Sequence, residues 1–85
     1  MSGKRYESEG SAQGRIEGKY ANYFEIGHNA FEFLLDFGQM YSDGVQQKIH
    51  TRIVTGPSYA KELLQVLERS IEQYEQQFGL IKQDE

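Results

Sequence analysis

Two histidines and three carboxylates are the side chains of this sequence best suited to metal binding or acid–base chemistry. They are His28 and His50 with Glu25, Glu32 and Asp36. A histidine with converging carboxylates can hold a metal ion, and paired carboxylates can transfer protons when burial separates their pKa values. Strand alternation, however, places His28 on the apolar face of a predicted sheet and His50 on the outer face, so they do not share an ion within one chain. The carboxylates share a flat outer face with basic neighbours, where cross-strand charge pairing is the simpler interpretation. We therefore expect no metal, no cofactor and no catalytic residue.

The composition limits the class of protein. The chain has 85 residues, is 38% hydrophobic and 26% charged, and carries nine Lys and Arg against thirteen Asp and Glu, a net charge of −4. These values are those of one small globular domain. The acidic balance argues against broad binding to a phosphate backbone. Small secreted domains usually carry disulfides, and this sequence has no cysteine, so a cytoplasmic location is expected. No run of apolar residues approaches the ~18 needed to span a bilayer, so no membrane association is expected.

The chain divides into three parts. Residues 1–18 contain four glycines and few apolar side chains, which predicts a disordered polar tail because such a segment buries too little surface to offset its ordering entropy. Residues 19–81 form the single expected domain, and residues 82–85 are a polar end.

Two alternating segments predict a hairpin over about residues 20–37. Phe24 and Ile26 alternate with polar residues, and Phe33, Leu35 and Phe37 do the same in the next segment. A period of two is typical of half-buried strands. A two-residue turn at 29–30 would pair Ile26 with Phe33 and place both apolar sets on one face.

A third strand is predicted from about residue 45 to residue 55. A loop of Ser42, Asp43 and Gly44 pairs Phe37 with Ile49, which keeps the isoleucines of this strand on the apolar face. Such a loop is a type I turn closed by a bulge with its glycine in the left-handed region.

A helix is predicted over residues 57–78. Pro57 suits a first helical position, and Gly79 suits the end. Apolar residues recur on one side at spacings of three and four, and Leu63 and Val66 widen this stripe; its other members are Ala60, Leu64, Leu67, Ile71, Tyr74 and Phe78. The expected fold is therefore α+β, a three-stranded antiparallel meander followed by one long C-terminal helix packed on one face of the sheet.

Several short motifs together resemble a prokaryotic family catalogued as "domain of unknown function 3467". They are Tyr20-Ala21-Asn22, Glu32-Phe33, Asp36-Phe37, Arg52-Ile53-Val54, Pro57 with Ala60-Lys61, Leu64, Leu67, Tyr74-Glu75 and Phe78-Gly79. The resemblance covers about residues 19–81. It implies a bacterial or archaeal cytoplasmic protein and carries over no catalytic residue.

The leading hypothesis is a small non-enzymatic protein-interaction module. A sheet of this size is marginal alone and has open edges, so we expect a homo-dimer or larger homo-oligomer that binds a protein or peptide through the outer sheet face or an edge strand. The residues expected to form that surface are Tyr23, Leu34, Arg52 and Val54.

Two alternatives remain open. One is a nucleic-acid-binding accessory protein that stacks bases on aromatic side chains of the first two strands. The other is an enzyme whose site forms only between subunits, where His50, Asp36 and Glu32 would meet.

Overall fold

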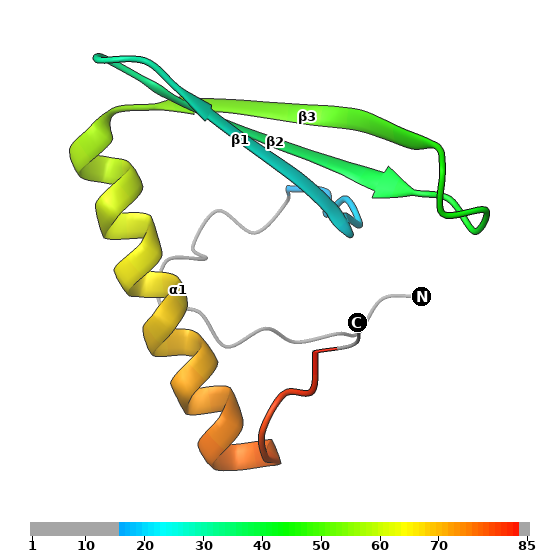
Figure 1. Cartoon of the computed structure of the whole chain (residues 1–85). Coiled ribbons are helices and arrows are strands. Elements are labelled where there is room, and N and C mark those ends of the chain that lie inside the picture. The colour runs from blue at the N-terminus through cyan, green and yellow to red at the C-terminus, as the bar shows by residue number, and fades with distance from the viewer. Residues whose placement is uncertain (1–15, 84–85) are drawn as a thin grey trace.

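Three antiparallel strands form a meander that is followed by one helix (Figure 1). The computed structural model describes residues 16–83. The elements are β1 (Tyr23–His28), β2 (Phe33–Met40), β3 (Gln47–Thr55) and α1 (Pro57–Phe78), and the sheet order is β1-β2-β3. The predicted fold class and element order are confirmed. Most of the polar tail predicted over 1–18, and the last two residues of the polar end predicted over 82–85, lie outside the described residues.

The first hairpin keeps the predicted faces but has a different register. Ile26 pairs with Leu35 and His28 with Phe33, so the predicted pairing of Ile26 with Phe33 is wrong. The cause is the side chain of Asn29, whose Oδ1 accepts hydrogen bonds from the backbone N–H groups of Phe31 (2.7 Å) and Glu32 (2.9 Å). This capping of the turn places Asn29 before the turn rather than within it. The pairing moves by one residue on each strand, so every side chain stays on its predicted face.

The second hairpin has a longer loop and a bulge. The N–H of Tyr41 donates to the carbonyl of Gln46, and Oδ1 of Asp43 accepts from the N–H groups of Val45 and Gln46. The predicted three-residue loop is therefore one residue too short, although Gly44 does adopt the predicted positive φ, at 70°. Phe37 pairs with Thr51 instead of Ile49, because the longer loop moves the register by one residue and a bulge in β3, between this pair and the next, moves it by one more.

Gly38 lies where β2 meets that bulge. A Cβ atom added to Gly38 would approach the carbonyl oxygen of Lys48 to 2.2 Å and Cα of Ile49 to 2.9 Å. The two strands therefore come together more closely here than a side chain at position 38 would permit. The bulge inserts His50 as the unpaired residue of β3.

The helix has the predicted bounds. Pro57 occupies its first turn and Gly79 ends it with φ of 99°, where the Gly79 N–H donates to the carbonyl of Glu75 at 2.9 Å. The predicted stripe is present, because apolar residues recur at the spacing of one helical face.

The helix does not cover the sheet of its own chain, which corrects the prediction that it packs on one face. It leaves the end of β3 and runs away from the strands (Figure 1), and none of its residues is buried. The connection is the single residue Gly56, held extended at φ −83° and ψ 164°. A proline restricts the residue before it to this extended region, so Gly56 continues the extended path of β3 into the first turn of α1.

The buried part of the described chain is small. Among residues 16–83, Leu35 is the only hydrophobic residue that is buried, at 8% exposed, and Asp36 next to it is the only buried charged residue. Both lie in the central strand β2. A domain normally buries one continuous core. Within residues 16–83, this chain instead leaves most of its large apolar side chains exposed.

Candidate interaction surface

One face of the sheet, here called the inner face, carries Phe24, Ile26, Leu35, Phe37 and Ile53. Register places Phe24 opposite Phe37, Ile26 opposite Leu35, and Leu35 opposite Ile53. The rings of Phe24 and Phe37 meet edge to face with centroids 5.8 Å apart. These contacts organise the face without covering it, since Phe24 remains 58% exposed and Ile26 60%.

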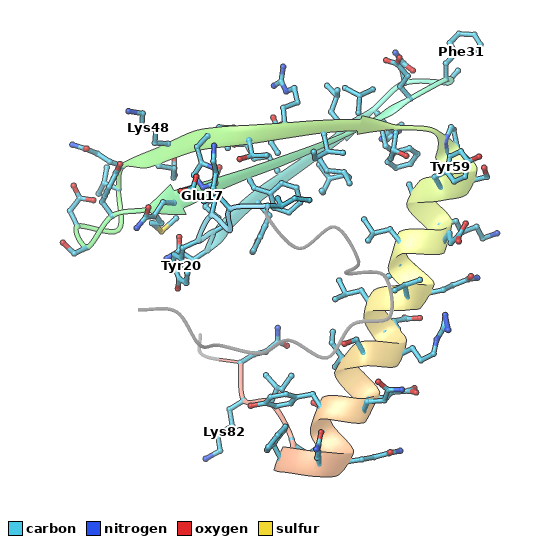
Figure 2. All side chains as sticks on the ribbon, turned by 180° about the vertical axis from the view of Figure 1, so that it is seen from behind. Glu17, Tyr20, Phe31, Lys48, Tyr59 and Lys82 are labelled. Carbon is cyan, nitrogen blue, oxygen red and sulfur yellow. The ribbon has the colours of Figure 1, made fainter. Side chains whose placement is uncertain are left out.

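The second apolar surface is the helix stripe, defined as Ala60, Leu63, Leu64, Leu67, Ile71, Tyr74 and Phe78. Figure 2 shows mainly carbon side chains on the side of α1 that faces the space beneath the sheet, and charged tips on its other side. Tyr74 and Phe78 contact each other with ring centroids 5.0 Å apart. Leu67, near the middle of the helix, is 52% exposed.

The inner face and the helix stripe both border the angle between the sheet and the helix. Residues 16–22 run on the helix side of the sheet (Figures 1 and 2), and Phe37 of the inner face meets that segment. Two apolar surfaces that border one open angle form a much larger patch than monomeric proteins normally expose. This arrangement can bind another apolar surface.

The outer face carries all four residues predicted to bind a partner. Leu34 pairs with Val54, Arg52 lies across from Asp36, and Tyr23 lies on the same side of β1. The structure therefore places Tyr23, Leu34, Arg52 and Val54 on one surface, as the strand alternation predicted.

An ion pair occupies the centre of the outer face. Nε and Nη2 of Arg52 each donate a hydrogen bond of 2.8 Å to the carboxylate of Asp36, in the forked geometry that guanidinium favours. These hydrogen bonds hold the pKa of Asp36 below its ordinary value and raise the pKa of Arg52. At the rim, the Tyr23 hydroxyl donates to Glu25, which raises the pKa of Tyr23. The polar groups of this face are thus largely paired with one another.

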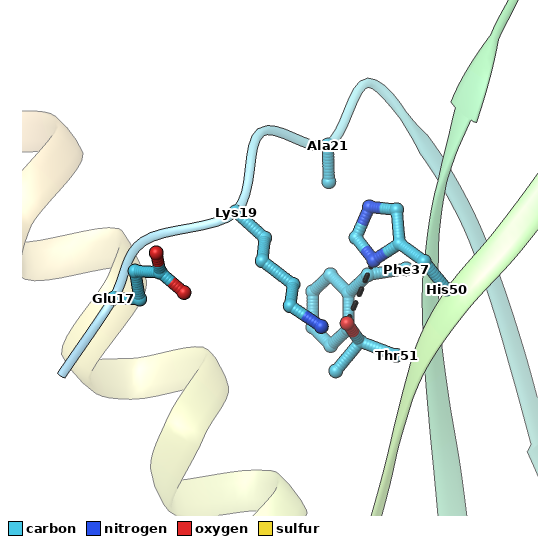
Figure 3. A pocket seen from close by; sticks show the side chains of 6 residues that line it. All are labelled: Glu17, Lys19, Ala21, Phe37, His50 and Thr51. Carbon is cyan, nitrogen blue, oxygen red and sulfur yellow. Dashed lines mark hydrogen bonds between the residues drawn. The ribbon is translucent and has the colours of Figure 1, made fainter.

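A shallow pocket lies on the inner side of the sheet, between β3 and the segment that precedes β1 (Figure 3). It is lined by Glu17, Lys19, Ala21, Phe37, His50 and Thr51. His50 is held on both sides, by Thr51 Oγ1 at 2.7 Å from Nδ1 and by the Tyr20 carbonyl oxygen at 2.9 Å from Nε2. Both ring nitrogens therefore have hydrogen-bonding partners in the protein.

The position of His50 corrects the prediction that it lies on the outer face. The bulge shifts His50 out of strict alternation, so it joins Phe37 and Thr51 on the inner side while Asp36 points to the outer side. Glu32 lies at the end of the first turn. The three residues considered for a site between subunits therefore do not meet within one chain. Gly38, opposite the bulge, is the sequence signal that indicates this displacement, because a glycine within a strand often marks a bulge.

No group of three or more His, Asp or Glu side chains able to hold a metal ion occurs within residues 16–83. Within the same residues, no helix is both long and apolar enough to cross a membrane.

Comparison with known proteins assigns a family without assigning an activity. No curated protein and no solved structure is significantly similar to the chain. The family model described as "Protein of unknown function (DUF3467)" matches residues 4–83, which extends well beyond the segment over which the motifs pointed to it. The chain therefore belongs to this family of unknown function.

Proposed function

We propose that this protein is a small non-enzymatic protein-interaction module whose main binding surface is the inner face together with the helix stripe. The observation that carries the proposal is the exposure of both surfaces in a chain that buries Leu35 as its only hydrophobic residue among those described. Apolar surface removed from water stabilises a complex by about 25 cal/mol per Å². A partner that covers these surfaces supplies the burial that the chain lacks by itself.

The outer face and the sheet edges provide a second surface for a protein or peptide. β1 and β3 are both edge strands, and an extended peptide can add to such an edge through backbone hydrogen bonds. Leu34 and Val54 form the apolar part of the outer face beside the Arg52–Asp36 pair. We place this protein and its partner in the cytoplasm, because small secreted domains usually carry disulfides and this sequence has no cysteine.

Cysteine labelling tests whether the main surface is covered by protein. The natural chain has no cysteine, so Leu67→Cys introduces one thiol into the helix stripe and Arg69→Cys introduces one on the opposite side of the same helix. Both positions are exposed in the single chain, so a thiol reagent reacts with both at similar rates if nothing binds. We expect Leu67→Cys to react at least about tenfold more slowly, because covered thiols are inaccessible to the reagent.

The labelling is measured in purified protein and again in a cell extract. Slow reaction in either condition supports a protein-binding surface. Equal rates for the two variants in both conditions contradict the proposed function.

A further inference from the structure

We propose that the occupant of this surface is a second copy of the same chain, with the helix stripe of each copy packed on the inner face of the other. This inference rests on the proposed function and names its partner. Each chain has one sheet face that lacks a helix and one helix that lacks a sheet. A second copy supplies both missing elements at once.

The two surfaces match in length. The 22 residues of α1 span about 33 Å at 1.5 Å per residue. β2 and β3, with 8 and 9 residues, span about 27 and 30 Å at 3.3 Å per residue. One helix therefore covers one three-stranded sheet along its length.

The exposed area is enough for a stable dimer. Nine large apolar residues of the two surfaces are each between 39% and 67% exposed: Phe24, Ile26, Ile53, Leu63, Leu64, Leu67, Ile71, Tyr74 and Phe78. At about 200 Å² for a large side chain, they expose on the order of 900 Å² per chain. Stable protein interfaces bury about 800 Å² on each partner.

The connection between β3 and α1 favours packing on another chain over packing on its own sheet. Only Gly56 separates the strand from the helix, and the proline that follows it keeps Gly56 extended. The helix therefore projects from the sheet, as Figure 1 shows, and its stripe is presented to a neighbouring molecule.

Reciprocal packing also closes the assembly. When the helix of each copy lies on the sheet of the other, one two-fold axis relates the copies, and the inner face and helix stripe of both are covered. The charged side of α1 then faces solvent, because it lies opposite the stripe. The edges of the sheet remain open for another partner.

Chemical cross-linking tests this arrangement directly. The double variant Ile26→Cys/Leu67→Cys of the full chain carries one thiol on the inner face and one on the helix stripe, and a short bismaleimide joins thiols that lie close together. We expect a covalent two-chain product on a denaturing gel. The matched control Ile26→Cys/Arg69→Cys, with the helix thiol on the opposite side, is expected to give little of that product. Ile53→Cys replaces Ile26→Cys if the latter fails to fold, since it lies on the same face.

Four results would overturn the inference. A one-chain cross-link shows that the helix covers its own sheet. A two-chain product of equal yield in the control shows association by another surface. Absence of any cross-link, with Leu67→Cys protected only in cell extract, shows that a different protein is the partner, in which case the proposed function stands and only the second copy is rejected. Equal labelling of Leu67→Cys and Arg69→Cys in every condition rejects both the proposed function and the second copy as partner.

Discussion

Gly38→Ala is expected to destabilise the sheet strongly for a one-methyl change. The added Cβ would lie 2.2 Å from the carbonyl oxygen of Lys48 and 2.9 Å from Cα of Ile49. Both are backbone atoms of β3, so neither can rotate aside as the tip of a side chain would. Carbon–oxygen contacts between strands normally lie at about 3.3 Å or more, so the strands must separate by roughly 1 Å.

The size of the effect follows from that displacement. Added volume in a packed region typically costs 1–3 kcal/mol, and we expect Gly38→Ala to lower the free energy of unfolding by about 2 kcal/mol. Replacing a glycine also restricts the unfolded chain, but the gain of about 0.4–1 kcal/mol does not offset the collision. In a domain of this size, such a loss lowers Tm by roughly 8–16 °C.

Gly27→Ala is the matched control. Gly27 lies in β1 of the same sheet, and a Cβ added there meets nothing within 4 Å. Its Tm should therefore change little or rise slightly. Thermal unfolding is followed by far-UV circular dichroism at one fixed protein concentration, because the stability of an assembly depends on concentration. Equal Tm values for the two variants would refute the close approach at the bulge, and with it the position of His50.

Two further predictions concern the outer face. Hydrogen bonds from Arg52 keep the pKa of Asp36 below its ordinary value of 3.8, so near this pH the folded state binds fewer protons than the unfolded state. The ion pair therefore stabilises the fold above pH 3.8, and this stabilisation is lost as the pH falls through the lower pKa of the folded state. Thermal unfolding of Asp36→Asn should accordingly depend less on pH below about pH 4 than that of the natural chain, and parallel acid profiles would contradict a role for the pair. Leu34→Asp places a charge on the outer face, which the sequence alone favours as the surface for assembly. If copies pair through the inner face, the native mass of this variant by light scattering stays that of the natural protein. A fall to the single-chain mass would show that the interface is on the outer face.

The sequence predicted the elements well because their signals are local. The bounds of α1 follow from Pro57, Gly79 and the apolar spacing between them, and the structure has the same bounds. Strand faces were also predicted correctly on either side of the first turn, because a shift of one residue on each strand preserves alternation.

The errors arose where one residue changes the register or the direction of the chain. Asn29 moved the first turn by binding two backbone N–H groups, and the bulge at His50 moved that side chain to the inner face. Neither effect is visible in the spacing of apolar residues along the sequence, so that spacing could not reveal them. The direction of α1 depends on the single linking residue Gly56, whereas the prediction that the helix covers its own sheet rested on the need to bury apolar surface. That need is real, but a second chain can meet it.

The candidate surface was predicted in part. The four outer-face residues share one face as expected, yet the larger uncovered surface lies on the inner side and on the helix, which the sequence analysis had assigned to the core. An apolar pattern indicates which residues avoid water, and it does not indicate whether the covering element belongs to the same chain.

Light scattering of the purified full chain over a dilution series is the most direct test of the account. Reciprocal packing predicts a native mass twice the chain mass of 9.8 kDa, maintained on dilution until the protein dissociates and unfolds together. Leu67→Asp, in the helix stripe, should lose that mass, while Arg69→Asp, on the opposite side of α1, should keep it. A natural chain that stays folded at 9.8 kDa at every concentration would contradict the claim that a second copy covers the inner face and the helix stripe.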